Sequence, residues 1–303
     1  MQRFRDEGRL TGGWRERLLR ALVLAAVALP CSAALAGGVV VTIIDGRTAK
    51  ADITLPNPNG GNYTAEFELE FETQGLGNLT VECIGISADV LTPAEITDIQ
   101  NNRVPHPGGT QIVDPAFPVR VTVEPPPGCG LTFQDQYDVT YETDDLVYTP
   151  FSPYRLLKAP IGGQFLYVTD SVTSGSVRSR GRAGGFSEFI IIKDLAQNDT
   201  NYTADCRDYY QRLGTRLDNS AISPTARHTL EIDLQVSLAA YNAGNYAEAI
   251  AHLANFDAHC AEYGGEALPN RWRSARDLDN IEGDLVGHAA TLKFLMNRLS
   301  GAP

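Results

Sequence analysis

The sequence predicts a mainly β N-terminal sandwich followed by a small all-α bundle, behind an export signal. Three observations carry this prediction: apolar and polar residues alternate before residue 196, apolar residues recur with helical spacing after residue 197, and the N-terminus is basic and then apolar. The predicted parts are 1–36 for the signal peptide, 37–196 for an antiparallel, Ig-like β-sandwich, and 197–303 for an up-and-down helical bundle.

The N-terminus has the three zones of a secretory signal peptide. Six arginines precede an unbroken apolar run, Ala21–Leu29, which is too short to span a bilayer. Ala34 and Ala36 then supply small residues where a signal peptidase reads the chain. Cys31 follows Pro30 rather than a small residue, and no two arginines are adjacent, which disfavours lipidation and the twin-arginine route. An uncleaved anchor helix is the alternative.

The net charge limits the class of partner. The whole chain carries −12, and the signal peptide contributes +3 through six arginines and three acids, so the mature part carries −15. Nucleic-acid binding needs clustered Lys and Arg, and anionic membranes attract the same residues. We therefore expect no nucleic-acid partner. With the signal peptide, we expect an exported protein, periplasmic or extracellular, that has no transmembrane segment after signal cleavage. Its partner is expected to be an unidentified protein or a cell surface. Its oligomeric state stays open.

Four cysteines remain after Cys31 leaves with the signal, which are Cys83, Cys129, Cys206 and Cys260. An even number in an exported chain predicts disulfides. Three pairings are allowed, and pairing within each predicted domain, 83–129 and 206–260, is favoured. Zinc would need closely spaced cysteine pairs, which the sequence lacks.

Strands are predicted from alternation. Apolar residues occupy every second position from Tyr63 to Phe71, with glutamates between them, as in a strand with one face in water. Shorter strand signals are Val39–Ile44, Ala51–Leu55, Leu79–Cys83, Val119–Glu124, Tyr137–Tyr141, Tyr154–Leu157, Phe165–Thr169, Ser176–Arg180 and Ser187–Ile192. Thr92, Pro93 and Glu95 form a capping box, which predicts a short helix to about Gln100.

Four helices are predicted in the second half. They run from Asp199 to Leu217, from Ser223 to Gly244, from Tyr246 to Tyr263, and from about Trp272 to Leu299. Short connections make neighbouring helices antiparallel.

Two stretches resemble known families. One stretch resembles the closing hairpins of sandwich domains in bacterial surface proteins. It contains Val168-Thr169, then a glycine-rich connection, then a strand with the sequence Phe186-Ser187-Glu188-Phe189. The segment Gly244–Ile250, followed by Leu253 and Phe256, is similar to the FIMAH helical domain. The whole chain resembles an uncharacterised exported proteobacterial family that joins two such domains. These resemblances imply a structural or adhesive module and no shared catalysis.

No catalytic or metal motif stands out. The five histidines are His106, His228, His252, His259 and His288. His252 and His259 lie seven residues apart and would need Asp257 or Cys260 to complete a metal site; solvated helix faces explain them equally well.

Two pairs of acidic residues are the remaining candidates for a catalytic or calcium site. Asp144-Asp145 and Asp135/Asp138 suggest either paired carboxylates for glycoside cleavage or a loop site for calcium. Acidic residues in so acidic a chain are more often simply solvated. We expect no catalytic residue, no cofactor-binding residue and no metal ligand, with calcium as the one cation considered. The alternative is a hydrolase with a loop-borne carboxylate site.

Arg178, Arg180 and Arg182 alternate along one predicted strand. They predict a basic patch on one face, which suits either a polyanion or an acidic partner. The simpler interpretation is an edge strand that charge protects from pairing with another chain.

Overall fold

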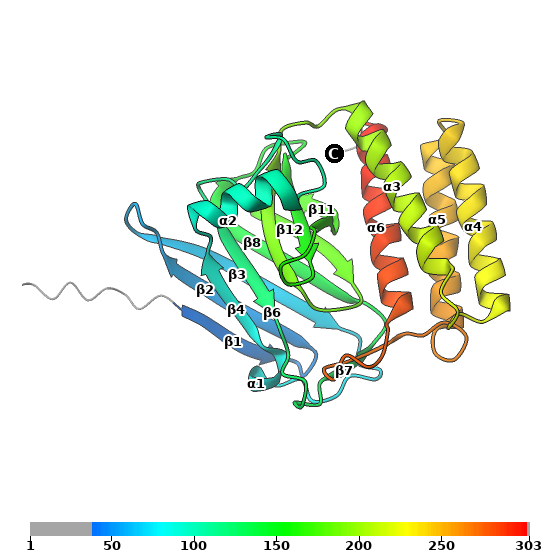
Figure 1. Cartoon of the computed structure of the whole chain (residues 1–303), viewed down its shortest axis with the longest axis horizontal. Helices are drawn as coiled ribbons and strands as arrows, with labels where there is room; N and C mark the ends of the chain where they lie inside the picture. The colour runs from blue at the N-terminus through cyan, green and yellow to red at the C-terminus, as the bar shows by residue number, and fades with distance from the viewer. Residues whose placement is uncertain (1–37, 302–303) are drawn as a thin grey trace, which may run out of the picture. The chain divides into compact units, whose positions relative to one another are not determined.

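The computed structural model describes residues 38–301, which belong to one compact unit. The predicted signal peptide, residues 1–36, lies outside the described residues. Two antiparallel sheets form the N-terminal part, and a layer of helices follows (Figure 1). The prediction of a mainly antiparallel β part followed by helices is therefore confirmed at this level.

The first sheet has six strands in the order β1-β2-β3-β8-β12-β11. Their bounds are Gly38–Ile44 (β1), Thr48–Pro56 (β2), Asn62–Phe71 (β3), Tyr137–Val147 (β8), Ser176–Ala183 (β12) and Thr169–Thr173 (β11).

The second sheet has the order β10-β9-β13-β6-β4, and β5 also pairs with β13. Its strands are Leu166–Tyr167 (β10), Tyr154–Ala159 (β9), Glu188–Asp194 (β13), Val119–Val123 (β6), Ile86–Val90 (β4) and Gln111–Ile112 (β5). A separate pair joins β7 (Thr132–Gln134) to β14 (Arg271–Arg273).

An aromatic core fills the space between the two sheets. The apolar side chains of β3 point inward, as the alternation predicted, and Phe67 and Leu69 are fully buried. The Phe67 ring lies 5.5 Å from that of Tyr141 on β8 and 5.2 Å from that of Phe189 on β13, measured between centroids. Such contacts hold the two sheets face to face.

The second sheet is buried on both faces. Phe189 and Ile191 of β13 belong to the core between the sheets, whereas Ile190 and Ile192 belong to a second core shared with the helices. This double burial explains why Phe189–Ile192 is a continuous apolar run rather than an alternating one.

Capping residues determine where two short helices begin. Thr92 and Glu95 form the predicted capping box at the start of α2 (Pro93–Asp98), and a π-helical turn, Ile99–Arg103, continues it. The predicted strand Leu79–Cys83 is wrong. The Thr80 hydroxyl accepts from the Cys83 amide at 3.2 Å and caps α1 (Val81–Ile84) instead.

Helices α3 (Asp199–Leu217), α4 (Pro224–Asn242) and α5 (Tyr246–Tyr263) follow the predicted segments closely. The fourth helix, α6 (Ile281–Leu299), begins nine residues later than Trp272. The segment before it forms β14, and the Asn280 side chain accepts from the Gly283 amide at 3.0 Å, which starts the helix there.

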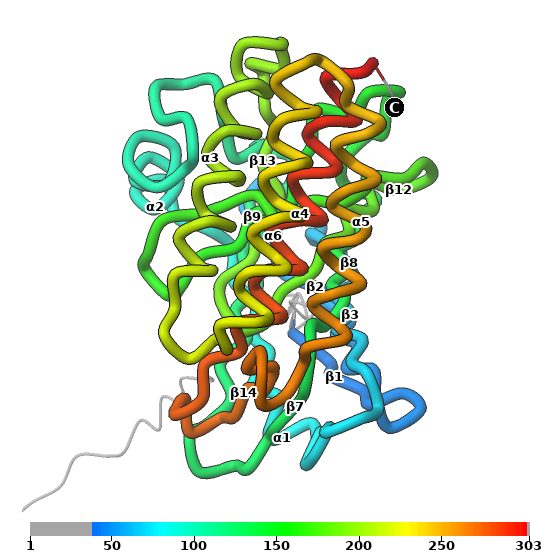
Figure 2. Tube along the Cα trace, turned by 90° about the vertical axis from the view of Figure 1, so that its right-hand side faces the viewer, coloured from blue at the N-terminus to red at the C-terminus, as the bar shows by residue number. Residues whose placement is uncertain are grey.

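The four helices contact one another in a ring, α3-α4-α5-α6, and α3 and α5 lie on opposite sides of α4 and α6 (Figure 2). Residues of β9, β10 and β13 share one hydrophobic core with these helices. The boundary predicted at residues 196/197 thus crosses a shared core, and the division into two folding domains stays a prediction. Among residues 38–301, no helix has the length and apolarity needed to cross a membrane.

Candidate functional site

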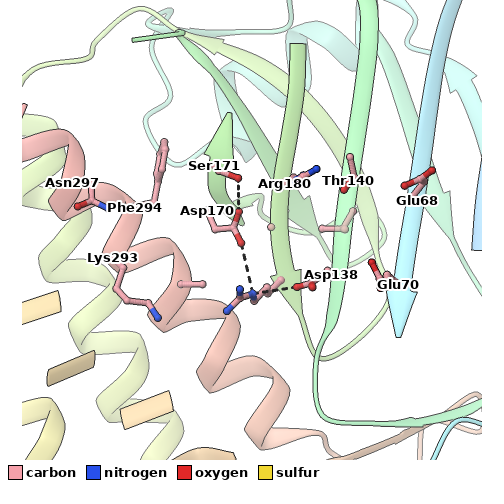
Figure 3. Close-up of a pocket in the computed structure, with 14 residues that line it drawn as sticks. Glu68, Glu70, Asp138, Thr140, Asp170, Ser171, Arg180, Lys293, Phe294 and Asn297 are labelled. Atoms are coloured by element: carbon pink, nitrogen blue, oxygen red, sulfur yellow. Dashed lines mark hydrogen bonds and ion pairs between the residues drawn. The ribbon is translucent and has the colours of Figure 1, made fainter. Parts of the chain in front are cut away.

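Helix α6 lies close to the backbone at the end of β12 and at Gly184, the residue that follows this strand, because glycines stand at the points of contact. A Cβ added to Gly287 would meet the Arg182 carbonyl oxygen at 2.7 Å, and one added to Gly283 would meet Gly184 Cα at 2.6 Å. Only glycine permits this approach. The following turns of α6 then stand beside the outer face of the first sheet, and a cleft of about 530 Å³ opens between them (Figure 3).

The outer face of the first sheet carries rows of charged side chains that strand register aligns, and two of the three rows, those of Glu68 and Glu70, line the cleft. Strand β8 lies between β3 and β12, so side chains line up in rows across three strands. The three rows are Glu66–Glu142–Arg178, Glu68–Thr140–Arg180 and Glu70–Asp138–Arg182. Each row runs from an acid on β3 to an arginine on β12.

The two outer rows are closed by ion pairs. The Arg178 Nε lies 2.5 Å from Glu142 Oε2, and this arginine lowers the pKa of Glu142. The Arg182 Nε lies 3.1 Å from Asp138 Oδ1 and 3.7 Å from Asp170 Oδ2. In both rows the carboxylate on β8 neutralises the neighbouring arginine.

The middle row is open because Thr140 replaces that carboxylate. Within residues 38–301, neither Arg180 nor Glu68 has an oppositely charged atom within 4.0 Å. The Arg180 side chain is exposed, and Glu68 is half-buried at the other end of the same row, two strands away on β3. A free cation and a free anion therefore face the same space across a small hydroxyl (Figure 3).

Helix α6 and β11 form the second wall. Lys293, Phe294 and Asn297 line it, and the Lys293 ammonium pairs with Asp257 of α5. Asp170 on β11 is largely buried, and its burial raises the pKa of its carboxyl. The Ser171 hydroxyl donates to that carboxyl at 3.0 Å.

The predicted arginine patch is therefore real but partly neutralised. Its edge-strand interpretation is wrong, because β12 pairs with β8 on one side and β11 on the other. Of the three arginines, only Arg180 offers an unpaired charge within the part of the chain that the structure describes.

The acidic pairs picked from the sequence do not meet in one place. Asp138 lines the cleft, whereas Asp144 and Asp145 lie beyond it near the end of β8, where Asp145 accepts from the Thr64 amide at 2.8 Å. Asp135 lies in the turn between β7 and β8 and accepts from the Asn270 side chain at 2.7 Å. These aspartates therefore form no common calcium or catalytic cluster.

One predicted disulfide forms and the other does not. Cys83 and Cys129 are bonded. Cys206 and Cys260 are buried free thiols, so the predicted 206–260 bridge is wrong. They lie on α3 and α5, which are opposite helices of the ring.

The histidines are separated as well. His106 Nε2 lies 2.6 Å from Asp205 Oδ1 of α3, a hydrogen bond that raises the pKa of His106. His259 Nδ1 lies 2.6 Å from Asp233 Oδ2 of α4, away from His252. Between residues 38 and 301, no three His, Cys, Asp or Glu side chains come together as a metal site.

Sequence reasoning missed Glu68, Asp170 and Lys293 as partners of one cleft. Arg180 alone was visible, through its alternation with Arg178 and Arg182. Only the register of β3, β8 and β12 and the packing of α6 bring these residues together.

Comparison with known proteins adds a family but no activity. No curated protein is similar to this chain. A family model does match residues 21–300, almost the entire sequence, and the chain belongs to that family of unknown function, DUF6689.

Proposed function

We propose that the chain is an exported, non-catalytic binding protein of the bacterial envelope that takes its ligand in the cleft between the first sheet and α6. The basic and then apolar N-terminus supports export to the periplasm or medium. In this proposal the β part is an Ig-like sandwich, the helices are a FIMAH-like up-and-down bundle, and the family is proteobacterial. The ligand belongs to a protein or cell-surface partner rather than to a nucleic acid.

The open middle row carries this proposal. Arg180 suits a carboxylate, Glu68 suits an ammonium group, and Thr140 leaves room between them. Two strand spacings, about 10 Å, separate the backbones of the two charged residues. A zwitterion of amino-acid or short-peptide size fits both the charge pattern and the volume of about 530 Å³.

Calorimetry with a panel of amino acids, dipeptides and tripeptides tests this function. Arg180→Gln and Glu68→Gln should each weaken binding of the best ligand by about 10- to 100-fold, the usual effect of losing a charged hydrogen bond. Arg276→Gln is the matched control, because Arg276 pairs with Glu124 at 3.2 Å and does not line the cleft. Absence of binding across the panel, or equal effects of all three substitutions, would refute the proposal.

A hydrolase is the second candidate, and one observation favours it. The largely buried Asp170, whose pKa is raised by burial, lies close to the same arginine as the more exposed Asp138, so the cleft holds two carboxyl groups in different environments. We rank it second because Arg182 engages both groups. Turnover of a glycan or peptide substrate that disappears in Asp170→Asn would replace the binding function with a hydrolytic one.

A further inference from the structure

Strand β1 leaves one long side of the first sheet unpaired. Among residues 38–301 it pairs only with β2, and it lies on the side of the sheet away from α3, α4, α5 and α6 (Figure 1). Its seven residues are Gly-Val-Val-Val-Thr-Ile-Ile. Val39, Val41 and Ile43 pack on the core between the sheets, while Val40 is 63% exposed.

The other ends of the two large sheets in the described chain are protected in the ways that monomeric proteins use. Helix α6 covers β11, and β10 has only two residues. Strand β4 has five residues and carries Asp89, which accepts from Arg120 at 2.8 Å. Charge, shortness or a covering element prevents pairing with another chain at such edges.

Strand β1 has none of these protections along its length. It contains no charge, no proline and no bulge, and its register with β2 is continuous from Gly38 to Ile44. Helix α1 and strand β4 both contact β1, but α1 has only four residues, and β4 belongs to the second sheet and does not pair with β1. Within the described part of the chain, the outer amide and carbonyl groups of β1 therefore have no backbone partner and are available to a partner strand.

We propose that two copies of this chain associate through antiparallel pairing of β1 with β1, which joins their first sheets. The strand is complementary to itself about Val41. A two-fold axis there places Val40 opposite Thr42 of the second copy, and Val39 opposite Ile43. No like charges meet within the paired strands, although the whole chain is acidic.

A second copy suits this edge better than an unrelated acidic or basic strand. On the outer face, Val40 and Thr42 are flanked by Asp52 and Lys50 of β2, which already pair with each other at 3.3 Å. Across the two-fold axis, these charges are separated from their equivalents by about three strand spacings, or 14 Å, beyond the screening length at physiological salt.

Sedimentation velocity measures whether the purified chain is a monomer or a dimer, and charges introduced into β1 test whether this strand forms the interface. The unsubstituted protein should be dimeric at about 100 µM, where a complex with a micromolar Kd is largely formed. Val40→Lys with Thr42→Lys places lysine opposite lysine twice and should leave a monomer at the same concentration. Val40→Lys with Thr42→Glu places opposite charges together and should restore the dimer.

Ile232→Lys with Val236→Lys is the control. Both residues are exposed apolar side chains of α4, 47% and 42% accessible, so this pair adds the same charge away from β1. It should stay dimeric. A monomeric unsubstituted chain, a dimer that survives the double-lysine change in β1, or loss of the dimer in the α4 control would each overturn the proposal.

Discussion

Raising the pH from about 5 to about 8 should weaken the fold through one side chain, Glu282. This residue lies in the first turn of α6 and is 2% exposed. Burial, followed by the nearby Asp135, raises the pKa of its carboxyl to about 8. The buried Oε2 atom of Glu282 has no hydrogen-bond partner among the described residues, as expected for a group that resists ionisation.

The sign and size follow from proton linkage. The unfolded chain loses this proton near pH 4.5, whereas the folded chain keeps it until about pH 8, so the folded state binds more protons in this interval and stability falls as the pH rises. At about 1.4 kcal/mol per pKa unit, the limit is about 5 kcal/mol. We expect nearer 3 kcal/mol between about pH 5 and about pH 8, because the unfolded chain has already lost most of this proton at about pH 5 and the folded carboxyl is only about half ionised at about pH 8.

Urea unfolding of the unsubstituted chain and Glu282→Gln between about pH 5 and pH 8 measures this effect. Glutamine is neutral throughout, so the free energy of unfolding of the variant should gain about 3 kcal/mol relative to the unsubstituted chain across the interval. Taking the difference cancels other groups, including His288, whose pKa burial lowers to about 4. Glu266→Gln, an exposed neighbour, is the control. Parallel profiles for the unsubstituted chain and Glu282→Gln would refute the reasoning.

Three further predictions concern the cysteines and the shared core. In the chain without the predicted signal peptide, and so without Cys31, a thiol reagent should find no reactive thiol in the native state and two after denaturation, because Cys206 and Cys260 are buried and burial raises the pKa of Cys206 to about 12. Immediate native labelling would contradict this. Replacing Cys83 and Cys129 together by serine should cost about 4 kcal/mol in urea unfolding, the value for a loop closed over a separation of 46 residues; an unchanged midpoint would exclude a native bridge. Trp272 stacks on Phe133 of β7, so its fluorescence follows unfolding of the β part, while circular dichroism follows the helices. Both signals should change in one coincident transition, because the second sheet and the helices share a core. Two separated transitions would instead support independent domains.

Local sequence signals predicted the regular elements well. The alternation in β3 and the capping box at Thr92 depend on neighbouring residues only, and both appear as expected. The prediction of a strand at Leu79–Cys83 was wrong because the Thr80 hydroxyl caps a helical turn in this stretch. The late start of α6 and the β7–β14 pair depend on contacts between residues far apart in sequence, for which spacing gives no signal.

The candidate site was much less predictable. Alternation identified the three arginines, but the acids that neutralise two of them sit on β8 and β11, and their alignment depends on strand register. The second cysteine pair failed for a related reason. Helical periodicity places Cys206 and Cys260 in the interior of the helical layer, yet it does not say which helices are adjacent.

The position of α6 has a consequence for biogenesis. The last helix of the chain, Ile281–Leu299, lies against β11 and β12 on one side and α3 and α5 on the other. Until the ribosome has added this segment, the preceding helices and the second sheet cannot close their common interior. Consolidation of this shared core therefore waits until the segment Ile281–Leu299 is present. Chains that terminate before it would leave the core open to proteases.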